Sequence, residues 1–460
     1  MVTQEVDLPL SPTALLLRCA AEPFVCVLDG GSLASWGMGE AWLGFQPRAT
    51  LRIGADGAVL VCVDGCEQPW RGDPFDVLDR FRREQEPPGA AAGLGGAGGV
   101  VAALSYDLRH WVERLPRRPQ EDRGVPVLHA AAYDWFLCYS YADRKYRLRS
   151  SRCDAARLRS VAERLRQLAA GPPIASQPAR VRVQSDWGRT EYVGAVRAAL
   201  DYIAAGDVYQ VNLAQRFTLT DLSGAVPVSP LALFASLQAQ HPMPFAAYVD
   251  GGDFVLVSNS PECFLTLRGR HIATCPIKGT RRRGNDAAGD RALIAELRSD
   301  PKERAEHVMI VDLERNDLGR VCETGSVQVS DFARVRTFPS LHHLVSTVTG
   351  RLRPEVTLAA VLRATFPGGS ITGAPKVRAM EIIDALEPVR RSFYTGAIGV
   401  IGAGGDATFN LAIRTVVAGE GTATYHAGGG IVADSDPHRE HEESVLKAAP
   451  IFHALQTRAA

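Results

Sequence analysis

From residue 206 onward the sequence consists largely of short β-rich runs separated by glycine turns. The runs are FVLVS, FLTLRGRHIATC, TGAIGVI, ATFNLAIRT and TATYHAGGGIVA. Two helical patterns interrupt them, one around 291–316 and one at 375–386. Strict alternation of strands and helices would predict a parallel doubly wound sheet, whereas strands and helices in blocks predict an α+β protein.

A chain of 460 residues is long enough for two or three domains. Stretches rich in proline and glycine lie at 86–99 and 169–188. The second is the stronger boundary because Gly171-Pro172-Pro173 separates two helical patterns. We therefore expect an N-terminal accessory domain at 1–170 and a second domain at 187–455. Its first helix should be capped by Thr190 and end at Gly206.

Charge and composition exclude several classes of protein. The 51 basic residues balance 51 acidic residues, which argues against a general attraction to nucleic acid or to anionic membranes. No apolar stretch is long enough to span a membrane, and Glu5 and Asp7 stand where a signal peptide carries positive charge. Nine scattered cysteines without a CxxC pair are typical of reduced thiols. We expect a cytoplasmic protein.

Two glycine-rich segments resemble nucleotide-binding loops but have the wrong context. Gly93, Gly95 and Gly98 match the G-x-G-x-x-G spacing, yet an extended run, VVAALSYD, follows where a helix should begin. The segment GGSITGAPK at 368–376 lacks the Gly-Lys-Ser/Thr ending of a phosphate loop. A nucleotide-dependent oxidoreductase is therefore a poor alternative.

Lysine is rare, with only Lys145, Lys278, Lys302, Lys376 and Lys447 in the chain. A lysine amine can lose its proton and attack carbon, which an arginine guanidinium cannot. Lys278, in the segment TCPIKGTRRRG that we predict to be a loop, is the first candidate nucleophile.

Glu262, in SNSPECF, lies one predicted hairpin before Lys278. Such a pair is usually a salt bridge. Near a substrate it can instead exchange protons, provided that burial moves both pKa values toward neutrality.

The segments SDPKERAEH at 299–307 and SDPHREHEESVLK at 435–447 both begin with Ser-Asp-Pro, a strong helix start. Each places two glutamates three residues apart on one helix face, Glu303 with Glu306 and Glu440 with Glu443. Four opposed carboxylates would suit Mg²⁺. The alternative is structural, with Glu303 in a capping box and Lys447 as the ion-pair partner of Glu443.

A carboxylate-binding site is the third candidate. In ATFNLAIRT, Arg414 falls on the polar face of the predicted strand, as an exposed edge charge or as a carboxylate clamp. The next strand carries Gly428, Gly429 and Gly430, whose backbone amides can approach an anion closely. A simple tight turn explains the glycines equally well.

Nine segments in order along residues 206–443 resemble the chorismate-utilising enzymes. They are GDVYQVNL, SNSPE, CPIKGT, ERAEHVMIVDLERNDLGR, HHLVSTV, GGSITGAPK, YTGAIGV, NLAIRT and AGGGIVADSDPHREHEE. The resemblance implies an α+β fold of large antiparallel sheets packed as a sandwich with flanking helices. It also makes 187–455 the chorismate-binding catalytic domain, while 1–170 resembles the accessory domain of this family more loosely.

Within the family, Lys278 indicates the member. The loop Pro-Ile-Lys-Gly-Thr is similar to aminodeoxychorismate synthase component I, whereas anthranilate synthases carry Pro-Ile-Ala-Gly-Thr. Isochorismate synthases carry a lysine where this chain has Gln210. The alternatives are anthranilate synthase component I and a non-catalytic chorismate-binding subunit.

This resemblance implies a covalent route in 4-aminobenzoate and folate biosynthesis. Lys278 attacks C2 of chorismate while the C4 hydroxyl leaves, and ammonia then adds at C4 and expels the lysine. The product is 4-amino-4-deoxychorismate. A separate glutamine amidotransferase subunit, component II, should supply the ammonia.

The resemblance also assigns residues. The catalytic set is Lys278, Glu262 and His343. The Mg²⁺ set is Glu303, Glu306, Glu440 and Glu443. The substrate-binding set is Gly279, Thr280, Thr372, Tyr394, Arg414, Gly428, Gly429, Gly430 and Lys447. Some members also bind tryptophan through a serine and an Arg-Tyr-Asp-Ile-like run. The corresponding segment here is GEAWLGF, which argues against a tryptophan site. Residues 242–245 would form the other wall of such a site.

Overall fold

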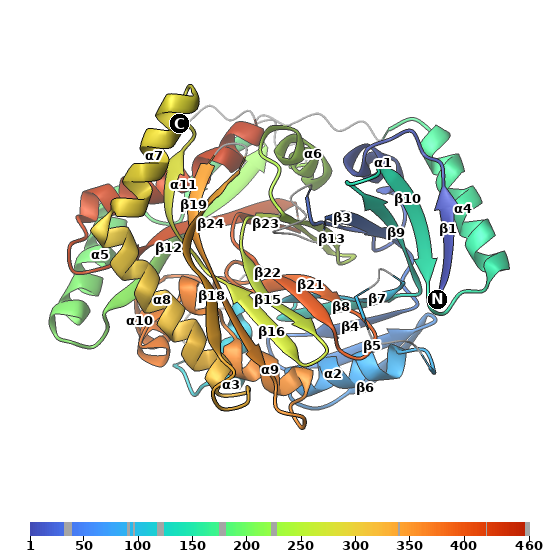
Figure 1. The fold of residues 1–460 in the computed structure, drawn as a ribbon, viewed down its shortest axis with the longest axis horizontal. Coiled ribbons are helices and arrows are strands. Elements are labelled where there is room, and N and C mark those ends of the chain that lie inside the picture. Colours follow the sequence, from blue (N-terminus) through green and yellow to red (C-terminus); the bar gives the residue numbers. More distant parts are fainter. Residues whose placement is uncertain are drawn as a thin grey trace.

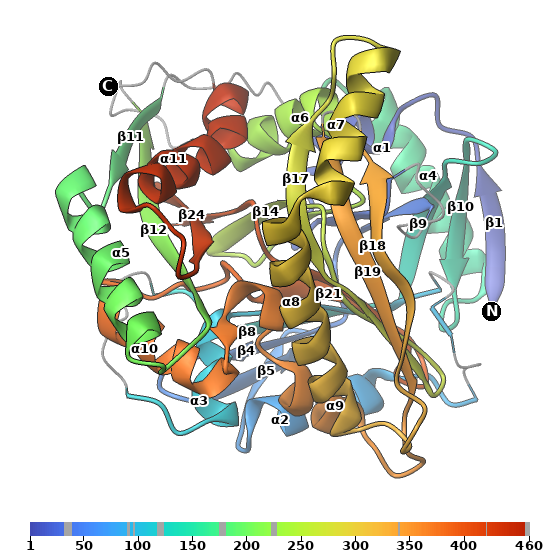
Figure 2. The same ribbon diagram turned by 60° about the vertical axis from the view of Figure 1, so that its left-hand side comes forward.

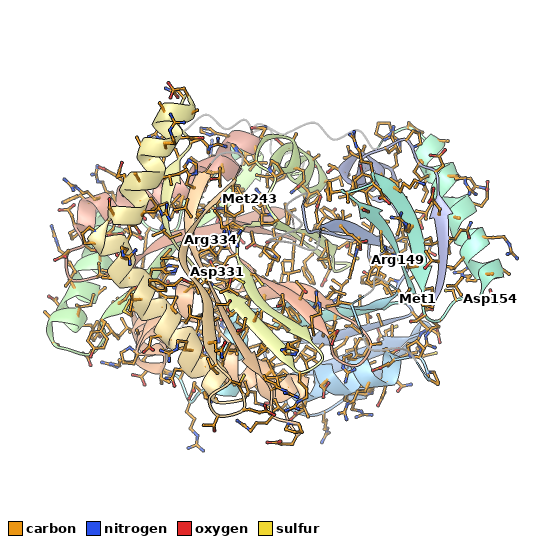
Figure 3. The ribbon with its side chains drawn as sticks, in the orientation of Figure 1. Met1, Arg149, Asp154, Met243, Asp331 and Arg334 are labelled. Carbon is orange, nitrogen blue, oxygen red and sulfur yellow. The ribbon has the colours of Figure 1, made fainter. Side chains whose placement is uncertain are left out.

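The computed structural model describes residues 1–460 except 32–38, 90–92, 95–96, 117–123, 174–180, 222–227, 339–340, 420 and 456–460. Two large antiparallel sheets face each other, and helices flank them (Figure 1). Side chains fill the space between the sheets (Figure 3). The expected α+β sandwich is confirmed.

The first sheet has twelve strands. In spatial order they are β1 (Val2–Val6), β10 (Lys145–Ser150), β9 (Trp135–Ser140), β3 (Glu40–Gly44), β2 (Cys26–Asp29), β13 (Phe245–Asp250), β14 (Phe254–Ser260), β23 (Thr415–Gly419), β24 (Thr422–Ile431), β12 (Gln210–Asp221) and β11 (Val181–Ser185), with β20 (Gly373–Ala374) also paired to β12.

The second sheet also has twelve strands. In spatial order they are β17 (Ile277–Arg282), β19 (Leu341–Arg351), β16 (His271–Cys275), β15 (Cys263–Arg268), β22 (Ala407–Leu411), β21 (Ala397–Ile401), β7 (Gly99–Leu104), β8 (Leu128–Tyr133), β4 (Ala49–Ile53), β5 (Val59–Val63) and β6 (Cys66–Trp70), with β18 (Gln328–Thr337) also paired to β19.

The helices are α1 (Pro12–Cys19), α2 (Pro74–Gln85), α3 (Arg109–Val112), α4 (Ala155–Ala170), α5 (Arg189–Ala204), α6 (Pro230–Gln240), α7 (Ala287–Ser299), α8 (Pro301–Gly319), α9 (Leu358–Thr365), α10 (Lys376–Leu386) and α11 (Pro437–Ala454), with short 3-10 turns η1 (Tyr106–Leu108) and η2 (Gly369–Ile371). In the described ranges, no helix combines the length and the apolar character needed to cross a membrane.

The core has three main layers. Between the sheets, residues such as Leu28 and Leu256 of the first sheet pack against Ala103 and Val400 of the second. A second cluster buries the outer face of the first sheet under α1, α4, α6 and α11. A third packs α2, α9 and α10 against the second sheet. Each sheet is thus covered on both faces, which explains its continuous apolar runs.

Both sheets contain strands from before and after the predicted boundary. In the first sheet β2 pairs with β13, and in the second β7 pairs with β21. The predicted boundary between 1–170 and 187–455 therefore divides the sequence but not the sheets, because strands from both parts are hydrogen-bonded to each other.

The helix starts predicted from capping chemistry are observed for α8 and α11 but not for α5. Asp300 and Asp436 cap α8 and α11 by accepting backbone hydrogen bonds, and each is followed by proline. Asp300 also separates α7 from α8, where the sequence pattern indicated one helical segment. The prediction for Thr190 is wrong, because the N-cap of α5 is Gly188, two residues earlier, and Thr190 lies inside the helix.

A buried ion pair joins three of the segments that lead to the candidate site. Arg391 is almost fully buried and pairs with Glu387 at 2.7 Å. Its guanidinium also donates to the carbonyls of Asn212 at 2.7 Å and Ile371 at 3.0 Å. Glu387 in turn accepts the backbone N–H of Ala214 at 2.9 Å. The pair thereby fixes β12 and η2 relative to α10.

Replacing Arg391 with methionine should destabilise the fold by about 3–5 kcal/mol, because Glu387 would be left buried and unpaired. The shift of the unfolding midpoint in urea measures the loss. The double variant Arg391→Met/Glu387→Leu should recover only part of it, since backbone groups at Asn212 and Ala214 stay unsatisfied.

The matched control is Arg166→Met, which breaks an exposed ion pair with Glu163 on α4 and should cost less than about 1 kcal/mol. Equal losses in the two single variants would contradict a special role for Arg391.

Candidate active site

Lys278 lies on the edge strand β17 and not in a loop, so that part of the expectation is wrong. Its pairing with β19 shifts register between Lys278 and Thr280, at Gly279, which has a positive φ of 72°. Such a bulge re-aims side chains at a sheet edge. The Lys278 amine donates to the carbonyl oxygen of Ser370 at 3.2 Å.

Glu262 lies just before β15, and only 5% of it is exposed. Its Oε1 accepts a hydrogen bond from the Ser370 hydroxyl at 2.7 Å and one from the Ile277 N–H at 3.3 Å. Burial raises the pKa of Glu262 to about 7, although Ser370, Lys278 and Ile277 favour the ionised form. The carboxyl can therefore give or take a proton near neutral pH.

Burial also lowers the pKa of Lys278 from its ordinary value, and the positive charge of Lys447 lowers it further. Glu306, Glu262 and Glu303 oppose this effect through their negative charges. Desolvation thus moves the amine toward its neutral, nucleophilic form.

Ser370 was not among the site residues predicted from the sequence. It lies in η2, 92 residues from Lys278 and 108 from Glu262, and contacts both. The signal was available in GGSITGAPK, which was rejected as a phosphate loop and then matched to the family, with Thr372 and not Ser370 as its candidate residue. Ser370 connects the candidate nucleophile to the candidate acid.

His343 lies on β19 opposite Thr280. Its Nδ1 is 2.9 Å from the Thr280 hydroxyl and 3.4 Å from the carbonyl oxygen of Gly279. The contact with the Gly279 carbonyl corresponds to the tautomer with its proton on Nδ1, which leaves a lone pair on Nε2. Burial, with the charge of Arg414, lowers the pKa of His343 to about 3. Nε2 is buried and has no protein partner within the described residues.

The four glutamates come from two helices that face each other, α8 and α11 (Figure 2). Glu306 senses the negative charge of Glu440 across the site, and burial raises the pKa of both carboxyls. Glu303 accepts from Arg281 at 3.2 Å, and Glu440 accepts from the Ser435 hydroxyl at 2.6 Å.

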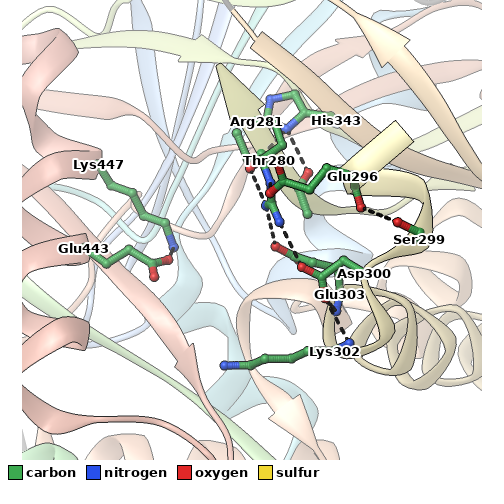
Figure 4. Close-up of polar contacts among 11 residues, drawn as sticks. Thr280, Arg281, Glu296, Ser299, Asp300, Lys302, Glu303, His343, Glu443 and Lys447 are labelled. Atoms are coloured by element: carbon green, nitrogen blue, oxygen red, sulfur yellow. Dashed lines mark hydrogen bonds and ion pairs between the residues drawn. The ribbon is translucent and has the colours of Figure 1, made fainter. Parts of the chain in front are cut away.

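Glu443 pairs with Lys447 at 2.7 Å, as the structural alternative predicted. Figure 4 places this pair on one side of the close-up and Glu303 on the other. Lys302, which the sequence analysis missed, extends its ammonium from α8 toward the pair (Figure 4). Its charge favours the ionised forms of Glu306, Glu440 and Glu443.

The donor set fits a hard divalent cation, but the carboxylates do not form a closed cluster. In the part of the chain that the structure describes, no three His, Cys, Asp or Glu side chains are grouped as metal ligands. Glu306 is half-buried, however, and accepts no hydrogen bond from the described residues. An unpaired carboxylate repelled by Glu303 and Glu440 is a position that a cation would stabilise.

Two glycines border the acidic pairs. A Cβ on Gly429 would lie 3.1 Å from Glu440 Oε2 and 3.6 Å from Lys447 Nζ, and one on Gly279 would lie 3.1 Å from Glu303 Oε2. Lys447 also donates to the carbonyl oxygen of Gly428 at 3.1 Å. Side chains at these two positions would crowd the acidic groups.

Arg414 does not lie on a strand, so its predicted position is wrong. It stands between β22 and β23 with a positive φ of 52°, a conformation that turns the chain between the two sheets. Burial lowers the pKa of its guanidinium. Its side chain makes no hydrogen bond or ion pair with other described residues. A half-buried guanidinium without a counter-ion among the described residues is suited to a bidentate carboxylate.

The other predicted substrate contacts differ in what they touch. Tyr394 is buried and stacks on His426, with ring centroids 5.2 Å apart and planes 10° apart. Thr372 turns its hydroxyl onto the carbonyls of Gly368 and Gly369 at 3.2 Å, which is a structural contact.

Gly430 lies against Gln210, since a Cβ there would come within 2.4 Å of its Nε2. Both amide atoms of Gln210 are buried without a protein partner in the described part of the chain.

Two cavities lie away from these residues. One of about 430 Å³ is lined by Arg48, Arg82 and Arg152, each paired with Asp134 or Glu86. The other, about 20 Å³, lies between β2 and the 244–247 segment, where the sequence suggested the wall of a tryptophan site. A space of that size holds a water molecule but no indole.

Comparisons with known proteins agree with this geometry. A family profile described as "chorismate binding enzyme" matches residues 33–453. Anthranilate synthase component 1 of Thermus thermophilus is 42% identical over 363 residues, 78% of each chain. Aminodeoxychorismate synthase component 1 of Klebsiella aerogenes is 42% identical over 360 residues, again 78% of each chain. The crystal structure of anthranilate synthase component I from Streptococcus pneumoniae has a TM-score of 0.80 at 30% identity, covering 90% of this chain and 92% of that one.

The carboxyl of Glu262 should titrate with a midpoint of about 7, protonated below and ionised above. Infrared difference spectra between the wild type and Glu262→Gln would isolate its band. Lys278→Met should raise the midpoint, because the ammonium favours the ionised carboxylate. Lys145→Met, at an exposed surface ion pair, is the control and should leave it in place. A midpoint near the ordinary value of 4.5 would contradict the burial argument.

Proposed function

The chain belongs to the chorismate-binding enzymes, and we propose that it aminates chorismate to 4-amino-4-deoxychorismate as an aminodeoxychorismate synthase component I. The observation that carries the proposal is Lys278. Its amine lies beside a buried carboxyl, and the pKa values of both groups are displaced toward neutrality. Equally similar relatives are named anthranilate synthase and aminodeoxychorismate synthase, so overall identity does not choose between them.

In the first step the neutral amine of Lys278 forms a bond to C2 of chorismate, the ring double bond shifts, and the C4–O bond breaks. Glu262, about half protonated near pH 7, gives its proton to the departing hydroxyl, which leaves as water. The resulting carboxylate then takes a proton from the alkylated lysine nitrogen. His343 is not the acid here, because its pKa of about 3 leaves almost none of its imidazole protonated near pH 7.

In the second step ammonia forms a bond to C4, the double bond shifts back, and the C2–N bond breaks. Lys278 leaves as an amine and recovers its proton from Glu262. The new ammonium at C4 gives one proton to the ionised Glu262, which returns the site to its starting state, while His343 stays neutral beside the ring. The net reaction consumes chorismate and ammonia and releases water, and it replaces one hard substitution by two displacements.

Binding uses the remaining charges. Arg414 would pair with the carboxylate of the pyruvyl group, and the backbone at Gly428, Gly429 and Gly430 would line the same end. Glu303, Glu306, Glu440 and Glu443 would hold Mg²⁺, which neutralises the ring carboxylate when bound. When no cation is bound, the positive charges of Lys447 and Lys302 offset part of the negative charge of the glutamates.

A glutamine amidotransferase subunit would supply the ammonia. We place the protein in the cytoplasm, where its nine free thiols would remain reduced. Anthranilate synthase component I remains the second candidate, favoured by the similarity to the relatives of that name. A non-catalytic chorismate-binding subunit would retain Arg414 but would have no need of the displaced pKa values of Lys278 and Glu262.

Mixing the protein with chorismate and Mg²⁺ without ammonia should trap an adduct, with a mass gain of chorismate less one water on the peptide containing Lys278. Lys278→Ala should lose the adduct, and Lys145→Ala, at an exposed surface pair, should keep it. With ammonium salt, the product should yield 4-aminobenzoate when a lyase is added. Accumulation of anthranilate would transfer the assignment to the second candidate.

Mg²⁺ should raise the melting temperature of the wild type. At a hundredfold excess over Kd, the free energy of unfolding should increase by about 2.7 kcal/mol. The double variant Glu306→Gln/Glu440→Gln should lose this response, yet be at least as stable as the wild type without metal because the mutual repulsion is relieved. Asp312→Asn, an exposed change on α8, is the control. An unchanged response in the double variant would rule out the proposed ligands.

A further inference from the structure

Helix α8 carries a buried carboxyl that none of the steps above uses. Glu314 is 3% exposed and lies two turns beyond Glu306 on the same helix. Its Oε1 accepts the backbone N–H of Gly369 at 3.1 Å, and its Oε2 accepts the Thr274 hydroxyl at 3.4 Å. Glu314 therefore binds the turn η2 on one side and strand β16 on the other.

The turn that Glu314 binds is the one that contacts both reactive groups. Gly369 is followed by Ser370, whose hydroxyl donates to Glu262 and whose carbonyl accepts from the Lys278 amine. The approach is close, since a Cβ on Gly369 would lie 3.1 Å from Glu314 Oε1. A shift of this turn would move a contact of Glu262 and a contact of Lys278 together.

A second brace holds the chain just before the turn. Lys376 donates to the carbonyls of Thr365 at 3.1 Å and Pro367 at 2.9 Å, and it pairs closely with Asp317. Asp317 lies one turn after Glu314 on α8. Glu314 directly, and Asp317 through Lys376, thus tie residues 365–369 to one face of α8.

We propose that Glu314 is a positioning residue of the active site, which holds η2 through the Gly369 amide so that Ser370 engages Glu262 and Lys278 at once. The inference rests on the proposed function for its kinetic consequence but not for its geometry.

The charges around Glu314 tell which substitution should preserve this role. Burial raises its pKa to about 8, the negative charges of Asp317 and Glu262 add to this, and Lys376 and the Gly369 amide oppose it. The carboxyl is then largely protonated at pH 7. Glutamine has the same shape, the same charge and an acceptor oxygen for Gly369, whereas leucine has no acceptor.

The kinetic test compares Glu314→Gln with Glu314→Leu by following the consumption of chorismate, whatever its product. Glu314→Leu should lower kcat about 10²-fold with KM unchanged, because reacting groups displaced by an ångström lose rate rather than substrate binding. Glu314→Gln should retain kcat near the wild-type value. Val311→Ala, a buried apolar change on the same helix, controls for lost stability and should leave kcat per folded molecule unchanged.

A second readout does not depend on the reaction. Competitive acetylation with acetic anhydride at pH 7, followed by mass spectrometry, gives the reactivity of Lys278 relative to the exposed Lys145. In Glu314→Leu the relative reactivity of Lys278 should rise, since the Ser370 carbonyl no longer stabilises the ammonium, and in Glu314→Gln it should not. If the wild type consumes no chorismate while the labelling behaves as expected, the proposed function fails and the positioning role stands. Equal kcat and equal labelling in all three proteins would overturn the positioning role.

Discussion

The site depends above all on the desolvation of one amine and one carboxyl, those of Lys278 and Glu262. Desolvation disfavours the charged form of each group, so it lowers the pKa of Lys278 and raises that of Glu262 to about 7. In water the two groups would be a simple ion pair. Here Ser370 stands between them and contacts both, so each keeps a hydrogen bond while neither is fixed in its charged state.

The surrounding fold holds these three groups in fixed positions relative to one another. Lys278 lies on the edge strand β17, Glu262 precedes β15, three positions inward, and Ser370 comes from a turn between α9 and α10. Buried polar contacts tie these pieces together, with Arg391 holding β12 and η2 from one side and Glu314 and Lys376 holding η2 and the chain before it from the other. Satisfied buried networks of this kind specify one arrangement, because a partly broken network leaves unpaired groups in the core.

Charge balance organises the opposite side of the site. Four glutamates from α8 and α11 face each other, and Lys302, Lys447 and Arg281 offset part of their repulsion. Glu306 accepts no hydrogen bond from the described residues, and Arg414 has no counter-ion among them. An unbalanced carboxylate and an unbalanced guanidinium are what the proposed substrate, which carries carboxylates, and the proposed cation would each neutralise.

The sequence by itself determined the features that depend on near neighbours. Alternating apolar runs indicated the strands, Ser-Asp-Pro indicated the starts of α8 and α11, and a spacing of three placed each glutamate pair on one helix face. It also singled out Lys278 and Glu262. Only the tertiary structure decided the bulge that re-aims Lys278, the position of Arg414 between two sheets, and the contacts of Ser370 with residues 92 and 108 positions away. The physical reason is that hydrogen bonds and desolvation act through space, and the displaced pKa values arise from the segments that happen to cover each group.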